Sequence, residues 1–254
     1  ATVDHPATSA LSATSGTFTG NIIIPNSGNI GSVGDTDAVT ITSAGLVGLN
    51  NTSPSSALAV NANLNDQWAG RFENTNSGGY GVLSRTTAST TSDIAFRVDK
   101  NGSETALNVD GAGHVTMPYQ PCFSATADTT DIPLTTITTV TLSSERFDVG
   151  SNLASNTFTA PITGKYLFTY MFYFNSVDAD HTSLDVHIKT SNKQYQQTFS
   201  PDHFLNSDSL FSVSGSVLAD MDASDTCFFS VRVAGGAAQT DIHVDSQVSG
   251  VLIC

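Results

Sequence analysis

The residues best suited to chemistry in this sequence are Asp and His side chains that alternate along short apolar runs. Asp241, His243 and Asp245 are each separated by one residue, so a β-strand would place all three on one face. Three copies of such a face around a symmetry axis could coordinate a cation. A solvated strand face is the simpler interpretation, and the sequence favours it over a metal site.

An acidic loop and three dispersed histidines are weaker candidates. Asp220, Asp222 and Asp225 lie close together, and carboxylate-rich loops suit Ca²⁺, although a plain acidic turn is the favoured interpretation. We expect His181, His187 and His203 to be surface residues and not metal ligands. No nucleophile motif, phosphate loop, metalloprotease helix or paired-carboxylate signature is visible. The sequence therefore predicts that the protein is not an enzyme and needs no cofactor.

The charge balance argues against strongly acidic partners. Lys and Arg number 9 and Asp and Glu number 23, which gives a formal net charge of -14. Phosphate binding needs clustered Lys and Arg, so neither nucleic acid nor an anionic membrane is an expected partner. No apolar run approaches the ~20 residues that span a bilayer, so membrane insertion is not expected.

Residues 1–60 alternate short apolar runs with turns rich in Gly, Asn, Ser and Asp. This pattern predicts short strands at 21–25, 31–35, 38–41, 45–49 and 56–60. One copy of such a segment buries too little apolar surface to offset its chain entropy, whereas three copies wound around one axis could. A disordered linker is the alternative.

Residues 61–117 predict a small β module of meanders. Strands are expected at 68–72, 80–85, 94–98, 106–109 and 114–117, with Asn101-Gly102 in a hairpin turn. The stretches 48–54, 71–75 and 107–115 resemble shaft segments of bacteriophage tail fibres. This resemblance covers about residues 16–117 and implies an elongated, trimeric β shaft, in which Trp68 would be structural.

Residues 118–254 hold most of the aromatic side chains, and one run among them is largely apolar at both its even and its odd positions. Its even positions are Tyr166, Phe168, Tyr170, Phe172 and Phe174, and its odd positions from 167 to 173 are Leu, Thr, Met and Tyr. Side chains alternate between faces in a strand, so one face can fill a core while the other needs a partner surface. A subunit interface is the favoured partner, and coverage by the chain's own loops is the alternative.

Further alternating runs in this region predict a β-sandwich or jelly roll. Leu184, Val186 and Ile188 alternate with polar residues, and Cys227 begins an inward phase that continues at Phe229, Val231 and Val233. Cys227 is therefore expected to be a buried thiol that behaves as a small hydrophobic side chain. The chain has three cysteines, too few for a disulfide scaffold or a zinc site.

The same region resembles the C1q family. The matching stretches are 121–125, 147–148, 156–161, 166–168, 212–218, 227–231 and 249–253, together with Gly164. The resemblance implies a C1q/TNF-like jelly roll that packs as a homotrimer and binds ligands without catalysis. It also implies that the first and last strands pair antiparallel, which would bring Cys122 near Cys254 as two thiols or a disulfide. The chain departs from the family at 221–225, and a shaft-like segment replaces the collagen stalk.

Receptor contact is expected at loops distal to the shaft, because binding residues concentrate on loops. The candidate loops are 175–181, 192–195 and 201–207, and the aromatic residues available there for stacking on a sugar are Tyr195, His203 and Phe204. The side chains assigned to the core or the trimer interface are Phe147, Phe158, Tyr166, Phe168, Tyr170, Phe172 and Phe174.

Taken together, the sequence predicts an all-β protein in three parts. An extended attachment segment at 1–60 and a small module at 61–117 form the shaft, and a jelly-roll head occupies 118–254. The expected role is a trimeric, receptor-binding fibre subunit on a virion, joined to other virion proteins at its N-terminal end and binding a host surface glycan or protein. A capsid head fibre or decoration protein, an extracellular C1q-like lectin or adhesin, and a glycan-cleaving enzyme are the alternatives.

Overall fold

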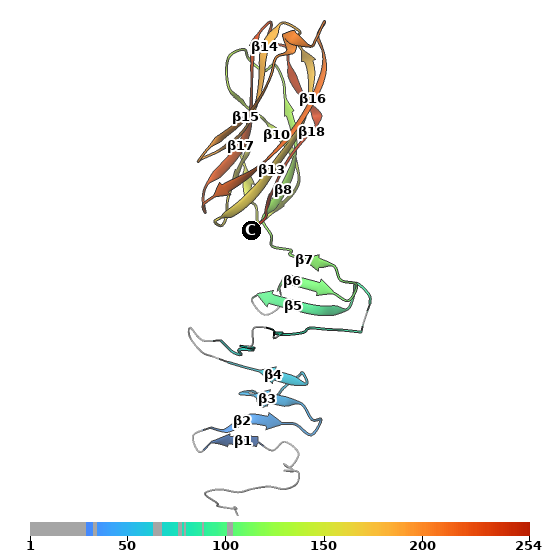
Figure 1. Ribbon diagram of the computed structural model, residues 1–254, viewed down its shortest axis with the longest axis vertical. Coiled ribbons are helices and arrows are strands. Elements are labelled where there is room, and N and C mark those ends of the chain that lie inside the picture. Colours follow the sequence, from blue (N-terminus) through green and yellow to red (C-terminus); the bar gives the residue numbers. More distant parts are fainter. Residues whose placement is uncertain are drawn as a thin grey trace, which may run out of the picture. The chain divides into compact units, whose positions relative to one another are not determined.

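The computed structural model describes residues 29–32, 35–62, 68–75, 78, 80–87, 89–100 and 104–254. Strands make up most of the regular structure of these residues, which confirms the predicted all-β class (Figure 1). A short 3₁₀ turn, η1 at Pro201–His203, is the one helical element among them, and none of their helices could cross a membrane. The strand predicted at 21–25 and the Asn101-Gly102 turn lie outside the described residues.

The chain divides into two compact units, residues 1–83 and 84–254. The first contains a four-stranded sheet in the order β1-β2-β3-β4. Its strands are β1 (Asn29–Ser32), β2 (Asp35–Ile41), β3 (Val47–Leu49) and β4 (Leu58–Val60). β3 and β4 pair in parallel, whereas the other two pairs are antiparallel. The strands predicted at 38–41, 45–49 and 56–60 are therefore confirmed.

Two predicted strands are wrong. Neither 68–72 nor 80–85 is a strand, and no described residue between 62 and 93 belongs to a sheet. Their apolar alternation is that of a strand, but the described part of one chain supplies no neighbour with which they could form a hydrogen-bond ladder. Among the described residues before 118, no Leu, Ile, Val, Phe, Tyr, Trp or Met side chain is buried.

The second unit begins with a three-stranded sheet that matches the predicted meander. Its strands are β5 (Ile94–Lys100), β6 (Glu104–Asp110) and β7 (Val115–Thr116), paired antiparallel in that order. Asp110 ends β6 and accepts a hydrogen bond from the backbone N–H of His114 at 2.9 Å, which closes the turn into β7.

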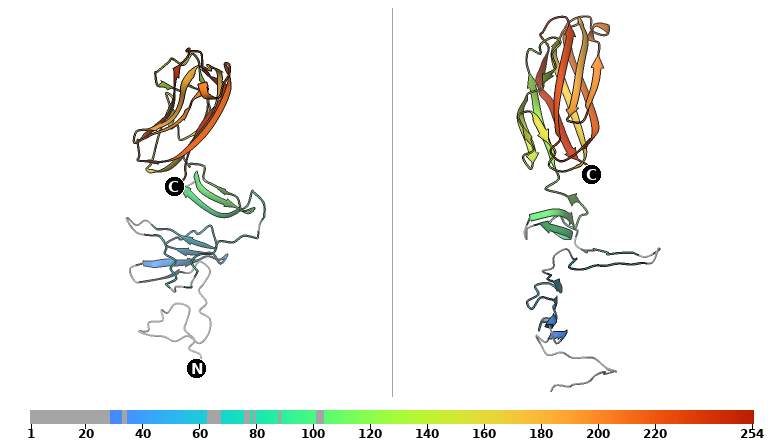
Figure 2. Two further views of the ribbon diagram at one scale, coloured as in Figure 1. Left: turned by 45° about the horizontal axis from the view of Figure 1, so that its top comes forward. Right: turned by 90° about the vertical axis from the view of Figure 1, so that its left-hand side faces the viewer.

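Residues 122–252 form a sandwich of two antiparallel sheets, which we call the head (Figures 1 and 2). The first sheet has the order β10-β8-β18-β13-β16 and the second the order β11-β12-β17-β14-β15, with β9 also paired to β17. The strands are β8 (Cys122–Thr129), β9 (Thr138–Thr139), β10 (Leu142–Val149), β11 (Leu153–Ala154), β12 (Thr157–Thr159), β13 (Gly164–Val177), β14 (His181–Thr190), β15 (Gln194–Phe199), β16 (Ser209–Met221), β17 (Thr226–Gly235) and β18 (Asp241–Leu252).

β13 supplies most of the aromatic side chains in the core between the two sheets. From β13, every even residue between 166 and 174 is buried, as the alternation predicts. Phe123 of β8 stacks on Phe158 of β12 with ring centres 5.1 Å apart, so the two sheets are joined through aromatic contacts. β14 and β17 supply the facing layer, which includes Val186, Val231, Phe229 and the predicted buried thiol of Cys227.

The first and last strands of the head are neighbours. β8 pairs antiparallel with β18, and Cys122 faces Val251. The backbone N–H of Leu252 also bonds to the carbonyl of Pro121 at 2.9 Å. The chain therefore enters and leaves the head at the same end, as the family resemblance implies.

Candidate functional site

A cavity opens between the edge strands of the two sheets. β15 ends one sheet and β16 ends the other, so their outer edges are not paired within the chain. The space between them has a volume of about 220 Å³ and is open to solvent on one side. We call it the edge cavity, and its lining residues are Tyr170, Val186, Ile188, Tyr195, Gln196, Gln197, Gly215, Ser216 and Val217.

The floor of the edge cavity depends on the pairing of β13 with β16. Tyr170 faces Gly215 across this ladder, and a Cβ at Gly215 would lie 2.7 Å from the Tyr170 hydroxyl. Only glycine therefore leaves room for the phenol, which donates a hydrogen bond to the side-chain carbonyl of Gln197. Burial raises the pKa of Tyr170 to about 12, so its hydroxyl acts as a neutral hydrogen-bonding group.

A second hollow shares Tyr195 with the edge cavity. Its volume is about 380 Å³, and Asn192, Lys193, Asp220 and Asp222 form its other walls. The Lys193 ammonium lies 5.1 Å from the centre of the Tyr195 ring. An aromatic ring between amide, hydroxyl and charged groups offers both stacking and hydrogen bonds, which suits a polyhydroxylated ligand.

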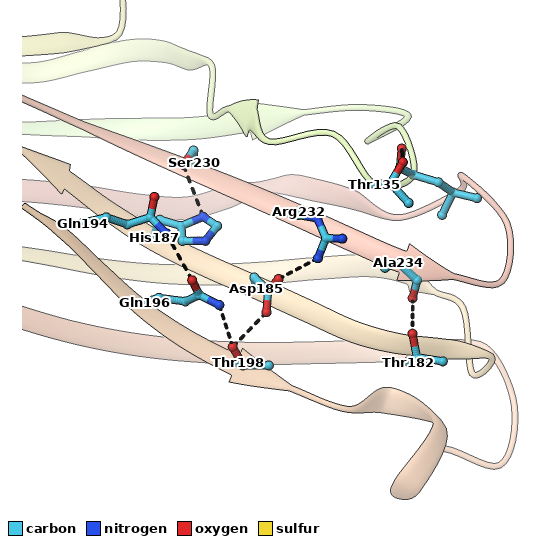
Figure 3. Close-up of polar contacts among 11 residues, drawn as sticks. Thr135, Thr182, Asp185, His187, Gln194, Gln196, Thr198, Ser230, Arg232 and Ala234 are labelled. Atoms are coloured by element: carbon cyan, nitrogen blue, oxygen red, sulfur yellow. Dashed lines mark hydrogen bonds and ion pairs between the residues drawn. The ribbon is translucent and has the colours of Figure 1, made fainter.

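The outer face of the second sheet carries connected polar side chains, which we call the polar row (Figure 3). Asp185 lies at its centre: it accepts a hydrogen bond from Thr198 at 2.8 Å and pairs with Arg232 at 3.1 Å. Gln196 continues the row by donating to Thr198 at 2.9 Å. The carboxylate is therefore held by a cation and a hydroxyl, as a buried charge requires.

Two buried histidines correct the expectation that His181 and His187 lie at the surface. His187, at the end of the polar row, is 2% exposed and its Nδ1 lies 3.3 Å from the Ser230 hydroxyl. His181 is fully buried, and its ring nitrogens contact the carbonyl of Gly235 at 2.7 Å and the Thr240 hydroxyl at 2.8 Å. Each of the two rings therefore has a hydrogen-bond partner nearby. Neither ring nitrogen of His181 is left unpaired, as is usual for buried polar atoms.

The Ser230 and His187 pair does not form a nucleophilic site. Ser230 is completely buried, so a substrate could not reach its hydroxyl. The Asp185 carboxylate bonds to Thr198 and Arg232, and no hydrogen bond joins it to the His187 ring. A nucleophilic site needs a hydroxyl that a substrate can reach, and this arrangement does not supply one.

The structure separates the predicted receptor-binding residues. The turn that leads into Tyr195 lies at the end where the chain enters, because Asn192 bonds to Asp225 at 2.6 Å beside the start of β17. His203 and Phe204 lie at the opposite end, in and after η1, where Phe204 packs on Phe211 with ring centres 5.3 Å apart. The expectation that 192–195 is a distal loop is wrong, since the β14–β15 hairpin turns at the end near residue 121.

The candidate metal ligands at 241–245 do not come together as a set of three: Asp241 has a separate partner, and His243 and Asp245 pair with each other. Asp241 accepts the backbone N–H of Asp131 at 2.6 Å, and His243 pairs with Asp245 at 3.3 Å. In the acidic loop, the Ser191 hydroxyl and the backbone N–H of Asp222 bond to Asp225 and lower its pKa. In the described part of the chain, no group of three or more Asp, Glu, His or Cys residues is arranged to hold a metal ion.

The three cysteines are free thiols. Cys122 faces Val251 in the ladder, so Cys254 lies three residues beyond the facing position, about 10 Å along an extended chain. Burial, with a contribution from nearby Asp148, raises the pKa of the Cys122 thiol. The two thiols lie at the same end of the head, but no disulfide joins them.

Five outward side chains form an apolar row across the first sheet. The ladders place Leu218 opposite Leu167, Leu167 opposite Val251, Val251 opposite Cys122, and Cys122 opposite Val149. Leu218 is 58% exposed, and Met171 on the same face is 50% exposed, so the chain's own loops do not cover this face. Of the predicted core or interface aromatics, Phe147 is also half exposed, whereas the other six are buried.

Sequence reasoning missed the floor of the edge cavity. Gly215 in the middle of an otherwise regular strand marks a close approach, and it could have identified the contact with Tyr170. Gln197 has the same inward phase as Tyr195 and Phe199, so an amide is placed where an apolar side chain is expected. Neither residue indicates which strand it will face, because the strands that meet there are far apart in the sequence.

Comparisons with known proteins identify the head. The profile of the C1q domain matches residues 122–253. Among solved structures, the globular domain of zebrafish complement 1qA is similar, with 17% identity, a TM-score of 0.41, and coverage of 53% of this chain and 98% of that chain. A crystal structure of murine APRIL at pH 8.5 has 12% identity and a TM-score of 0.38, and covers 53% of this chain and 99% of its own.

No curated protein matches the chain. The resemblance of residues 16–117 to phage tail-fibre shafts stays a prediction. For the head, the profile match begins at the first residue of β8 and continues one residue past β18, so it covers the whole sandwich and slightly more than half of the chain. The chain belongs to the C1q domain family.

Proposed function

We propose that the chain is a non-catalytic, receptor-binding subunit of a viral fibre and that it acts as a homotrimer. In this proposal the head binds a host cell-surface glycan or protein. The residues before 118 form the shaft and join other virion proteins, so the protein is displayed on the virion surface. Three equivalent heads would let weak single contacts add by avidity.

The observation that carries this proposal is the apolar row on the outward face of the first sheet. A solvated outer sheet face normally carries polar side chains. Here Leu167, Leu218 and Val251 lie side by side, and the single chain leaves them partly exposed. In a three-fold assembly, each interface joins two different surfaces of neighbouring copies. The apolar row of one copy can therefore be covered by a different surface of the next copy.

Assembly is tested by measuring the solution mass of the purified full chain by light scattering. We expect three times 26.5 kDa, and we expect Leu218→Asp to shift the mass toward one chain because a carboxylate would be buried in the interface. Gln194→Asp is the matched control, since Gln194 is exposed on the other sheet. A single-chain mass for the unmodified protein would exclude the trimer.

Ligand binding is tested at the edge cavity, where Tyr195 joins the two hollows. Binding of the full chain to host cells or to a glycan array is compared for Tyr195→Ala and Phe204→Ala. If the ligand stacks on Tyr195, we expect its loss to weaken binding at least fivefold, or about 1 kcal/mol, while Phe204→Ala binds normally. The reverse result would move the receptor site to the other end of the head.

Membership in the C1q family also favours a second candidate, an extracellular lectin or adhesin that is not part of a virus. In a variant of the first proposal, the chain is a capsid head fibre or decoration protein instead of a tail-fibre subunit. Antibodies against the head, located by immuno-electron microscopy, distinguish the three: labelling of tails supports the fibre, labelling of capsids supports decoration, and labelling of a cell surface alone supports the adhesin.

A further inference from the structure

The residues between β4 and β5 expose an unusual amount of aromatic surface. We call residues 68–75 and 80–85 the aromatic segment. Trp68 is 85% exposed, Phe72 77% and Tyr80 92%, and the adjoining Val82 and Leu83 are 73% and 81% exposed. Single exposed apolar residues are common, but here five large ones fall within residues 68–83, and Phe72 and Tyr80 line one hollow, which indicates a contact surface.

Two glycines in the aromatic segment indicate what kind of contact this is. A Cβ added at Gly81 would meet nothing within 4 Å, and one at Gly70 would meet only the Phe72 ring at 3.7 Å. Neither has the positive φ that requires glycine, unlike Gly45 or Gly113. Glycine inside a strand-like segment marks a bulge, a tight bend, or a site where another backbone or a ligand approaches closely.

Other glycines of the chain have their reason within the chain. The missing side chain of Gly215 makes room for Tyr170, and that of Gly250 makes room for Phe123 and Phe168. Gly70 and Gly81 have no such neighbour, although they lie beside Phe72 and Tyr80. A backbone that packs closely against either glycine would therefore have to come from outside the described part of this chain.

We propose that the aromatic segment packs against the aromatic segments of two other copies of this chain. This inference rests on the homotrimer proposed above and specifies where its chains meet outside the head. Three extended segments around an axis would give each one the strand neighbour that it lacks alone. Trp68, Phe72 and Tyr80 would then form an aromatic layer, with Gly70 and Gly81 at the points of closest approach.

Charge favours a second copy as the occupant. The whole chain has a formal net charge of -14, so copies repel one another over most of their surfaces. The aromatic segment instead carries Arg71 and Arg85 against Glu73, a formal charge of +1. Arg71 and Glu73 pair at 2.5 Å, so the segment can meet its own copies with little repulsion.

The available area also fits an interface between copies. A Trp, Tyr or Phe side chain buries about 150–250 Å², so these three side chains offer roughly 500 Å² per copy. A stable interface needs about 800 Å² from each partner. Val82 and Leu83, which are 73% and 81% exposed, supply further area beside these three side chains.

The experiment uses Trp68, the only Trp in the chain, as its probe. Acrylamide quenching of Trp fluorescence is measured on the full chain, on the same sample whose mass is determined by light scattering. We expect a mass of three chains and a quenching constant several-fold below that of the guanidinium-denatured chain. After dissociation by dilution, the quenching constant should rise toward the denatured value.

The outcomes separate this inference from the homotrimer proposal. A three-chain mass with fully quenchable Trp68 overturns the inference and leaves the trimer intact. Shielding that persists in single chains also overturns it, because the chain would then cover its own Trp. A single-chain mass at every concentration tested overturns both.

Gly81→Val adds a second test, because its branched side chain would occupy the space kept for the neighbouring backbone. We expect the variant to make Trp68 as quenchable as in the denatured chain, while Ser89→Val, at an exposed residue outside the segment, leaves the shielding unchanged. Normal shielding in Gly81→Val would contradict the proposed close approach.

Discussion

His187 is a titratable side chain whose surroundings disfavour its charged form. Burial lowers its pKa most strongly, and nearby Lys189 lowers it further, whereas Asp185 and hydrogen bonds to Gln196 and Ser230 raise it. The net direction is downward, below the value of about 6.5 for an exposed His. Asp185 compensates only partly because Arg232 and Thr198 already engage its carboxylate.

This lowered pKa predicts a loss of stability in mild acid. Above about pH 6.5 His187 is neutral in both the folded and the unfolded chain, so it adds no pH dependence. As the pH falls below that value the unfolded chain takes up a proton that the folded chain does not, and the free energy of unfolding decreases until the folded pKa is reached. Urea unfolding at pH 7.5 and 5.5 should show a larger loss for the unmodified chain than for His187→Gln.

An equal loss in the two proteins would show that His187 is protonated as easily in the folded chain as in the unfolded one. The other histidines are the same in both proteins, so the comparison isolates the substitution at His187.

At the scale of single elements, β13 carries the core of the head on one face. Phe172 is fully buried and contacts Tyr170, Phe174 and Phe229 with ring centres between 4.9 and 6.4 Å apart. The adjacent residue, Met171, points to the opposite face and is half exposed. Neighbouring residues of one strand therefore contribute very differently to folding.

Phe172→Ala should destabilise the head by about 3–5 kcal/mol, since it removes a large buried side chain and leaves a cavity. Met171→Ala should cost less than Phe172→Ala, because the chain itself buries only half of the Met171 side chain. Denaturant unfolding monitored by circular dichroism compares the two. Similar losses would mean that the outward face is as well packed as the core.

The alternation of β13 and β17 is a local property, and so the sequence alone was enough to predict these strands and their buried faces. The burial of Asp185 and His187 could not be predicted in this way, because their covering partners Arg232, Thr198 and Ser230 come from β15 and β17. The edge cavity depends on Tyr170 meeting Gly215 across a ladder. Strands were wrongly predicted at 68–72 and 80–85. Alternation shows that a segment is compatible with a strand, but a strand also needs a neighbouring strand to which it can hydrogen-bond.

At the scale of the whole molecule, the charge of -14 opposes assembly of identical chains. Screening shortens the reach of that repulsion from about 30 Å at 0.01 M salt to about 8 Å at 0.15 M. If the trimer forms through apolar contacts, its apparent dissociation constant should fall as salt rises over this range. Sedimentation equilibrium at the two ionic strengths measures it, and weaker assembly at high salt would indicate that ion pairs hold the copies together.

The position of β8 determines how the head responds to mechanical force. A load transmitted along the chain reaches the head at residue 121 and pulls β8 along its own length, between β10 and β18. Its ladder hydrogen bonds are perpendicular to the strands, so tension loads them together in shear and does not open them one after another. A head attached through this strand would tolerate sustained pulling better than one attached through a terminal hairpin.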